Sequence, residues 1–119
     1  MRGLEESGAK AGDTMVVIGA GPIGLMFMNA AEIAGVEVIA VAKREDQIGA
    51  AKLFGARKVV HVGAVQDVVA ATRALTPAGR GADIVIEAVA VPGTWEWAVD
   101  MVRKGGVVNF LVVHRAGPR

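Results

Sequence analysis

The chain has 119 residues, of which 53% are apolar types and 21% are charged, a composition typical of a folded domain and not of a disordered chain. Its 13 Lys and Arg residues nearly balance its 12 Asp and Glu residues, so no net charge draws the chain toward nucleic acid or an anionic membrane. The absence of cysteine excludes a disulfide framework, a thiolate zinc site and an iron–sulfur cluster. We expect a single domain over residues 1–119, with neither nucleic acid nor membrane among its partners.

Residues 14–31 form an uncharged stretch that is long enough to span a membrane. Gly19, Gly21, Pro22 and Gly24 interrupt it, and a strand followed by a turn and a helix accounts better for the same residues. The first residues of the chain are charged and lack the apolar region of a signal peptide. These features predict a cytoplasmic location.

Short apolar runs alternate along the chain with segments of helical periodicity. Strands are expected at residues 15–18, 37–42, 58–62, 83–89 and 106–113. Helices are expected at residues 22–34, 45–54, 66–75 and 94–103, the last with Thr94 as its N-cap. Strands that are apolar on both faces and joined by helices predict a doubly wound parallel sheet of the α/β class, a Rossmann-type fold with helices on both faces. The expected order of the five strands is 3-2-1-4-5.

A G-x-G-x-x-G motif occupies residues 19–24, directly after the first expected strand and at the start of the first expected helix. This context is typical of a dinucleotide-binding turn. Gly19 would allow the tight turn, Gly21 would let the backbone approach a pyrophosphate, and Gly24 would let the helix pack closely on the strand. The helix N-terminus would supply free N–H groups to the phosphates. The alternative is a glycine-rich turn that binds nothing.

The second expected strand ends at Ala42, followed by Lys43 and Arg44. A carboxylate at this place would bind the ribose 2′-hydroxyl of NAD, and none is present. The two cations favour a 2′-phosphate and therefore NADP over NAD, with Arg44 the better candidate because its planar fork matches phosphate geometry. In the alternative, Arg44 pairs with a neighbouring carboxylate and binds no ligand. The missing carboxylate also disfavours a methyltransferase.

Several motifs together resemble the medium-chain, zinc-type alcohol dehydrogenases, and most of all their threonine, sorbitol and polyol members. They are Ala-Gly-Asp at residues 11–13, the glycine motif at 19–24, Ala-Lys-Leu-Phe-Gly-Ala at 51–56, Leu-Thr-Pro-Ala-Gly-Arg-Gly-Ala-Asp at 75–83 and Lys-Gly-Gly at 104–106. The resemblance covers residues 9–110. It implies an NADP- or NAD-binding domain of an enzyme that transfers hydride between a secondary alcohol or polyol and the nicotinamide.

The resemblance also implies a set of cofactor contacts along one edge of the sheet. Gly21, Pro22 and Ile23 would follow the pyrophosphate, Ala42, Lys43 and Arg44 would face the adenosine ribose, Ala88 and Val89 would lie near the adenosine, and Leu111 and Val112 would approach the nicotinamide. In this family the catalytic zinc ligands come mainly from another domain. We therefore expect no catalytic or metal-binding residue here, zinc only in the absent catalytic domain, and no turnover by the isolated chain.

The chain looks like an excised or truncated cofactor domain, because a sixth strand is not apparent. Its fifth strand would then be an open edge, which predicts edge-to-edge pairing with a second copy, another partner, or marginal solubility. A stand-alone nucleotide-sensing module remains the alternative function. Of the other notable side chains, His61 and the two tryptophans are interpreted as structural, and Glu87 either as a group near the cofactor or as a paired residue at a strand end.

Overall fold

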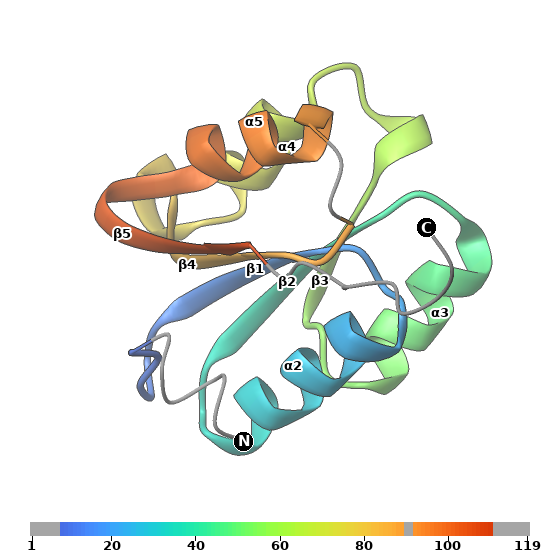
Figure 1. Ribbon diagram of the computed structural model, residues 1–119, viewed down its shortest axis with the longest axis horizontal. Helices are drawn as coiled ribbons and strands as arrows, with labels where there is room; N and C mark the ends of the chain where they lie inside the picture. Colours follow the sequence, from blue (N-terminus) through green and yellow to red (C-terminus); the bar gives the residue numbers. More distant parts are fainter. Residues whose placement is uncertain (1–7, 90–91, 111–119) are drawn as a thin grey trace, which may run out of the picture.

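The computed structural model describes residues 8–89 and 92–110, which form one parallel sheet between two layers of helices (Figure 1). The strands are β1 (Thr14–Ile18), β2 (Glu37–Ala42), β3 (Lys58–His61), β4 (Ala82–Glu87) and β5 (Val102–Phe110). The helices are α2 (Pro22–Ile33), α3 (Glu45–Leu53), α4 (Val68–Ala74) and α5 (Pro92–Met101), with short 3₁₀ turns at Val62–Ala64 and Pro77–Gly79. The strand order β3-β2-β1-β4-β5 confirms the predicted doubly wound fold.

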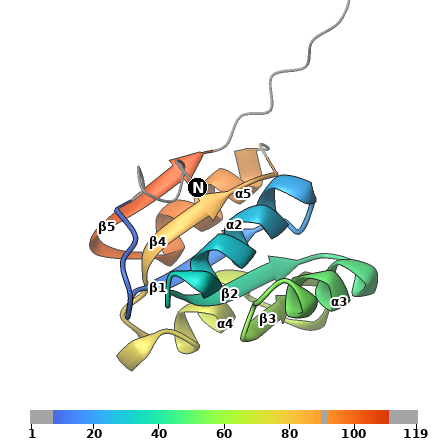
Figure 2. The same cartoon turned by 90° about the horizontal axis from the view of Figure 1, so that it is seen from below.

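The two helical layers explain why the strands are apolar on both faces. Helices α2 and α3 contact the sheet on one side, and α4 and α5 contact it on the other (Figures 1 and 2). Along β1, Met15 and Val17 join the core beneath α2, whereas Val16 and Ile18 join the core beneath α5. All five residues of β1 are buried, as expected for the central strand of a sheet that is covered on both faces.

Helix α5 and strand β5 begin earlier than the sequence pattern predicted. Helix α5 begins at Pro92, a residue type favoured in the first turn, so Thr94 lies inside the helix and the prediction that it is the N-cap is wrong. Strand β5 begins at Val102, because Ala82 pairs with Val102 before the register jumps to Ile84 and Val107. The predicted turn at residues 104–106 is therefore present as a bulge within the strand.

A network of charged side chains joins three strands at the amino-terminal end of the sheet. One carboxylate oxygen of Asp83 accepts a hydrogen bond from the backbone N–H of Thr14 at 2.8 Å. The other accepts a hydrogen bond from Nε of Arg103 at 2.6 Å and lies 4.0 Å from a guanidinium nitrogen of Arg80. Desolvation of Asp83 opposes its ionisation, but these donors outweigh it and hold the pKa of Asp83 below its usual value.

No helix in the described ranges, 8–89 and 92–110, is both long enough and apolar enough to cross a membrane. The uncharged stretch at residues 14–31 is divided instead between β1, the glycine turn and most of α2.

Candidate functional site

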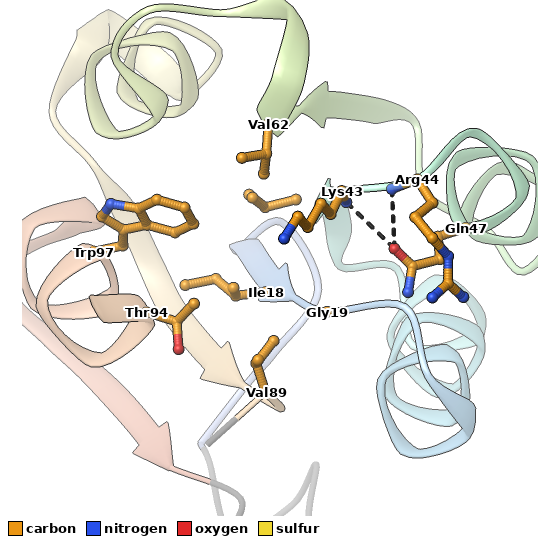
Figure 3. Close-up of a pocket in the computed structure, with 10 residues that line it drawn as sticks. Ile18, Gly19, Lys43, Arg44, Gln47, Val62, Val89, Thr94 and Trp97 are labelled. Atoms are coloured by element: carbon orange, nitrogen blue, oxygen red, sulfur yellow. Dashed lines mark hydrogen bonds between the residues drawn. The ribbon is translucent and has the colours of Figure 1, made fainter. Parts of the chain in front are cut away.

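A cavity of about 440 Å³ opens at the carboxyl ends of the strands, where β1 and β4 lead their chains to opposite faces of the sheet (Figure 3). Ligands of doubly wound proteins bind at this switch point. One wall is apolar and consists of Ile18, Val41, Val62, Val89 and Trp97. The remaining lining residues are Gly19, Lys43, Arg44, Gln47 and Thr94, which place the polar groups near the end of β2 and on α5.

The glycine turn connects β1 to α2 next to this cavity, and two of its glycines are required by the chain's own packing. Gly19 has a φ of +103°, and a Cβ there would lie 2.9 Å from Cγ2 of Val89. A Cβ on Gly24 would collide with the carbonyl oxygen of Gly19, so this glycine allows α2 to pack against the turn. Both positions fit the roles that the sequence predicted for them.

Gly21 differs, because none of the residues that the structure describes occupies the space beside it. Its φ is −75°, which any residue adopts, and a Cβ there would meet no atom within 4 Å. Gly21 is the N-cap of α2, Pro22 is the first helical residue, and no acidic side chain occupies the first turn. The amides of Ile23 and Gly24 have no acceptor within the helix, since the first helical bond runs from Leu25 to Gly21. The turn therefore combines open space with free donors, the features that a diphosphate needs.

Backbone hydrogen bonds fix the turn against the neighbouring strands. The N–H of Gly19 donates to the carbonyl of Val41 at 2.9 Å, and the N–H of Ala88 donates to the carbonyl of Ile18 at 3.0 Å. The side chain of Glu87 is fully buried at the end of β4, and its Oε1 accepts a hydrogen bond from the N–H of Val89. Glu87 thus orders the segment that forms the Val89 wall of the cavity, which supports a paired role at this strand end.

The basic turn after β2 brings two cations to the cavity, and they differ in their surroundings. Arg44 makes two hydrogen bonds to Asp46, at 3.1 and 3.3 Å, and both side chains are largely exposed. The bond from Arg44 is the main reason why the pKa of Asp46 lies below its usual value. In the described part of the chain, the ammonium group of Lys43 has no hydrogen-bond or ion-pair partner, and its side chain extends into the cavity (Figure 3).

The backbone of this turn is also tightly held. Oε1 of Gln47 accepts hydrogen bonds from the N–H groups of Lys43 and Arg44, at 3.3 and 3.1 Å (Figure 3). Nε2 of His61, the last residue of β3, lies 3.1 Å from the carbonyl oxygen of Lys43. Because a carbonyl only accepts, His61 must donate through Nε2 here.

The residues predicted to contact a cofactor fall into three groups. Gly19, Lys43, Arg44 and Val89 line the cavity directly. Gly21, Pro22, Ile23, Gly24, Ala42 and Ala88 lie in the adjoining turns and strand ends, with Ala42 buried in the core beneath α2 and α3. Leu111 and Val112 lie outside the described residues.

Part of the cavity wall was not predicted from the sequence. Val62, Thr94 and Trp97 reach the cavity from a 3₁₀ turn and from α5, far along the chain from the glycine motif. Trp97 also packs against the core beneath α5, so its structural interpretation is supported although it lines the cavity. Trp95 is exposed and contacts the ring of Phe110 edge-on at 5.7 Å between ring centres. Gln47 lies at the third helical position after Arg44, the N-cap of α3, but arginine is not a typical capping residue, so the role of Gln47 had no clear signal in the sequence.

The described residues do not fit a zinc ion. Within residues 8–89 and 92–110, no group of three or more His, Asp or Glu side chains is positioned to bind a metal. Any chemistry that needs zinc therefore has no ligand set in this part of the molecule.

Comparison with known proteins gives consistent matches over most of the chain. A family model described as zinc-binding dehydrogenase matches residues 22–116. The chain is 39% identical over 102 residues to L-threonine 3-dehydrogenase of Bacillus subtilis, covering 85% of this chain and 29% of that protein. It is 35% identical over 118 residues to NADP-dependent isopropanol dehydrogenase of Clostridium beijerinckii, covering 97% of this chain and 32% of that protein. The chain thus spans about a third of the length of these relatives.

Solved structures give the same result. Alcohol dehydrogenase TADH from Thermus sp. ATN1 superposes with a TM-score of 0.86 at 32% identity, over 98% of this chain and 34% of that one. The 2R,3R-butanediol dehydrogenase from Bacillus subtilis superposes with a TM-score of 0.87 at 30% identity, over 98% of this chain and 33% of that one. With the glycine turn and the cavity beside it, these matches establish that the chain belongs to the zinc-binding dehydrogenase family, in which it corresponds to the nucleotide-binding domain of zinc-type alcohol dehydrogenase-like oxidoreductases.

Proposed function

We propose that this chain binds NADP(H), in preference to NAD(H), with the diphosphate at the glycine turn and the adenosine in the adjoining cavity. The observation that carries the proposal is the open space beside Gly21, directly below the N-terminus of α2. A glycine is not needed there for backbone conformation or internal packing, so its absent side chain makes room for something outside the chain.

Each part of the site has a separate task in this proposal. Gly21, Pro22 and Ile23 follow the diphosphate, and the free amides of the first turn of α2 donate to its oxygens. Gly19 and Gly24 hold the turn in shape. The apolar wall of the cavity suits the flat adenine ring, because it offers low-polarity surface without competing donors.

The preference for NADP(H) rests on the end of β2. Ala42 presents no carboxylate to repel a 2′-phosphate, and Lys43 and Arg44 place two cations at the cavity. Lys43 is available as it stands, whereas Arg44 must release Asp46. That exchange is inexpensive, since an exposed ion pair contributes only about 0–1 kcal/mol. The same preference is supported by the similar Clostridium beijerinckii enzyme, which is named as an NADP-dependent isopropanol dehydrogenase.

In the intact enzyme the reaction would be hydride transfer between a secondary alcohol or polyol and the bound nicotinamide, which supplies the redox chemistry. The described residues contribute binding and orientation, with Ala88 and Val89 beside the adenosine. Leu111 and Val112, which follow β5, are proposed to approach the nicotinamide. Because the described residues form no zinc site, we expect no alcohol oxidation from this chain alone, even with zinc added.

Substitution of Gly21 by Ala tests the diphosphate turn. The new methyl group meets no protein atom within 4 Å, so the free energy of unfolding should change by no more than about 1 kcal/mol. Affinity for both NADPH and NADH should fall about tenfold or more, because the methyl group occupies the proposed phosphate position. Calorimetric titration of the wild type and the variant measures this effect. Unchanged affinity for both cofactors in a folded Gly21→Ala variant would contradict the proposal.

Substitution of the two cations tests the preference. The wild type should bind NADPH more tightly than NADH, and Lys43→Ala should reduce this preference by about tenfold, the value of one charge-assisted hydrogen bond. Arg44→Ala should reduce it less, contrary to the ranking of the two cations expected from the sequence, because Arg44 must first give up its pair with Asp46. Lys52→Ala, in the last turn of α3, removes a cation away from the cavity and should leave the preference unchanged. Equal affinities for NADPH and NADH that none of the three substitutions changes would contradict the proposal that Lys43 and Arg44 favour NADP(H).

Two further expectations from the sequence stay predictions. One is pairing of β5, the outer strand of the described sheet, with a second copy along the edge where Val107 and Phe110 are exposed. Sedimentation of the chain at increasing concentration would measure this association. The other is the cytoplasmic location.

A further inference from the structure

The turn at Lys43 and Arg44 is held from two directions, which is more than a helix start requires. An ordinary capping box satisfies the N-cap amide with one side chain at the third helical position. Here Oε1 of Gln47 accepts from two successive amides, those of Lys43 and Arg44. His61 adds a hydrogen bond to the carbonyl of Lys43 from a different strand. Both backbone polar groups of Lys43 are therefore fixed by side chains from α3 and β3.

The consequence falls on the Lys43 side chain. The backbone of Lys43 cannot rotate without breaking its hydrogen bonds to Gln47 and His61, and the Lys43 side chain extends from it into the cavity (Figure 3). A flexible lysine loses much conformational entropy when it binds a ligand. Fixing the backbone from which it extends reduces the remaining freedom and aims the ammonium group at one region of the cavity.

The neutrality of Gln47 is a second, independent observation. A Glu at the third helical position would accept the same two hydrogen bonds and interact more favourably with the helix N-terminus. Gln47, however, lines the cavity together with Lys43 and Arg44, so a carboxylate there would face any phosphate that they bind. The neighbouring acid Asp46 is already paired with Arg44. The chain thus has the uncharged acceptor at the one capping position that faces the ligand.

We propose that Gln47 and His61 form a clamp that sets the preference for a phosphate on the adenosine ribose, by fixing the Lys43–Arg44 backbone while adding no negative charge. Both are positioning residues that act through Lys43. The inference rests on the proposed NADP(H) function, and it assigns the selection of the 2′-phosphate to residues outside the two cations themselves.

The decisive variant is Gln47→Glu, because it keeps the acceptor and adds only charge. Adenosine 2′,5′-bisphosphate and adenosine 5′-monophosphate serve as probes, since they differ only in the 2′-phosphate. In the variant, the affinity for the bisphosphate should fall about tenfold, while that for the monophosphate changes less than about threefold. The free energy of unfolding should stay equal or rise. If Gln47 had only a structural role, binding would weaken only together with a loss of stability. Gln66→Glu adds the same charge in the loop before α4 and should change neither affinity.

The second arm tests His61 through loss and rescue. His61→Leu should weaken the bisphosphate selectively by about threefold to tenfold, and His61→Gln, whose amide N–H reaches a similar position, should restore most of the loss. If the wild type binds neither probe, or binds both equally, the proposed function or its NADP preference fails, and the clamp fails with it. If the wild type prefers the bisphosphate but Gln47→Glu and His61→Leu both keep that preference, the clamp alone is wrong.

Discussion

The two ends of the sheet are built on opposite principles. At the amino-terminal end, Asp83 receives hydrogen bonds from Thr14 and Arg103, and Arg73 donates to the carbonyls of Asp100 and Arg80 at 2.9 Å each. At the carboxyl end, glycines leave space, the first-turn amides of α2 have no helical acceptor, and the Lys43 ammonium has no partner in the described residues. One end uses its polar groups to join strands, whereas the other leaves the first-turn amides of α2 and the Lys43 ammonium available to a ligand.

This contrast assigns stability of the fold to the amino-terminal end of the sheet and ligand binding to its carboxyl end. Charged groups at the amino-terminal end are satisfied within the protein, so their loss should lower stability without changing ligand affinity. Groups at the carboxyl end should show the reverse, apart from the glycines that the turn itself requires. The substitutions below test that separation.

The largest effect is expected for Asp83→Ala. It leaves the Thr14 amide and the Arg103 guanidinium without their acceptor, at a cost of about 3 kcal/mol in the free energy of unfolding. Urea denaturation measures the loss, and dinucleotide affinity of the folded protein should be unchanged. Glu37→Ala, which removes an exposed pair with Lys58 at 3.3 Å, is the control and should cost less than about 1 kcal/mol. Equal effects of the two substitutions would show that burial of the Asp83 network adds no stability, and weaker dinucleotide binding by folded Asp83→Ala would contradict the contrast between the two ends.

Gly24→Ala, at the carboxyl end of the sheet, should be an exception to this separation, because it should lower both the free energy of unfolding and the affinity for the cofactor. Its methyl group collides with the Gly19 carbonyl, so the turn must shift, at a cost of about 2 kcal/mol and most of the cofactor affinity. Gly49→Ala is a matched control inside α3, where a methyl group meets nothing within 4 Å. It should raise stability by about 0.5–1 kcal/mol, because alanine is the better helix former. Destabilisation by Gly49→Ala, or none by Gly24→Ala, would show that the close contact is not limiting.

The smallest expected effect is the contribution of Asp83 to the loss of stability at low pH. Because the folded protein lowers the pKa of Asp83, its ionised form stabilises the fold above the unfolded value of about 3.9, and this contribution is lost as the pH falls through the folded pKa. The wild type should therefore lose more stability than Asp83→Asn as the pH falls from about 5 through the folded pKa of Asp83. Urea denaturation across this range measures the difference, since other carboxylates contribute alike to both proteins. Parallel pH profiles would mean that Asp83 is not preferentially ionised in the fold.

Much of the fold was predictable because local signals agreed. Apolar runs without alternation indicated buried parallel strands, and the glycine motif placed the first turn and helix. The start of α5 was missed because Thr94 offered a conventional cap, although Pro92 two residues earlier also marks a helix start. Gly105 and Gly106 marked an irregularity at this point of the chain, but the bulge itself could not be anticipated, since it depends on the register of β5 with β4.

The site was predictable only where its residues are close in sequence. The glycine turn and the two cations each form a short motif with a known physical purpose. Trp97 and Val62 join them only through the crossover connections that bring α5 and the end of β3 to the same edge. The hydrogen bond from His61 to Lys43 likewise needs the pairing of β2 with β3, which places His61 opposite Ala42.

The bulge in β5 bears on how this edge behaves in concentrated solution. Between Val102 and Val107 the strand departs from regular pairing with β4, and Arg103 and Lys104 carry charge within that interval. Of the nine residues of β5, only the run from Val107 to Phe110 therefore has the regular backbone that could pair with another strand. Irregular, positively charged backbone is a poor seed for stacking many chains edge to edge. The same irregularity that shifts the register therefore makes this edge a poorer surface for edge-to-edge stacking than a regular strand of nine residues would be.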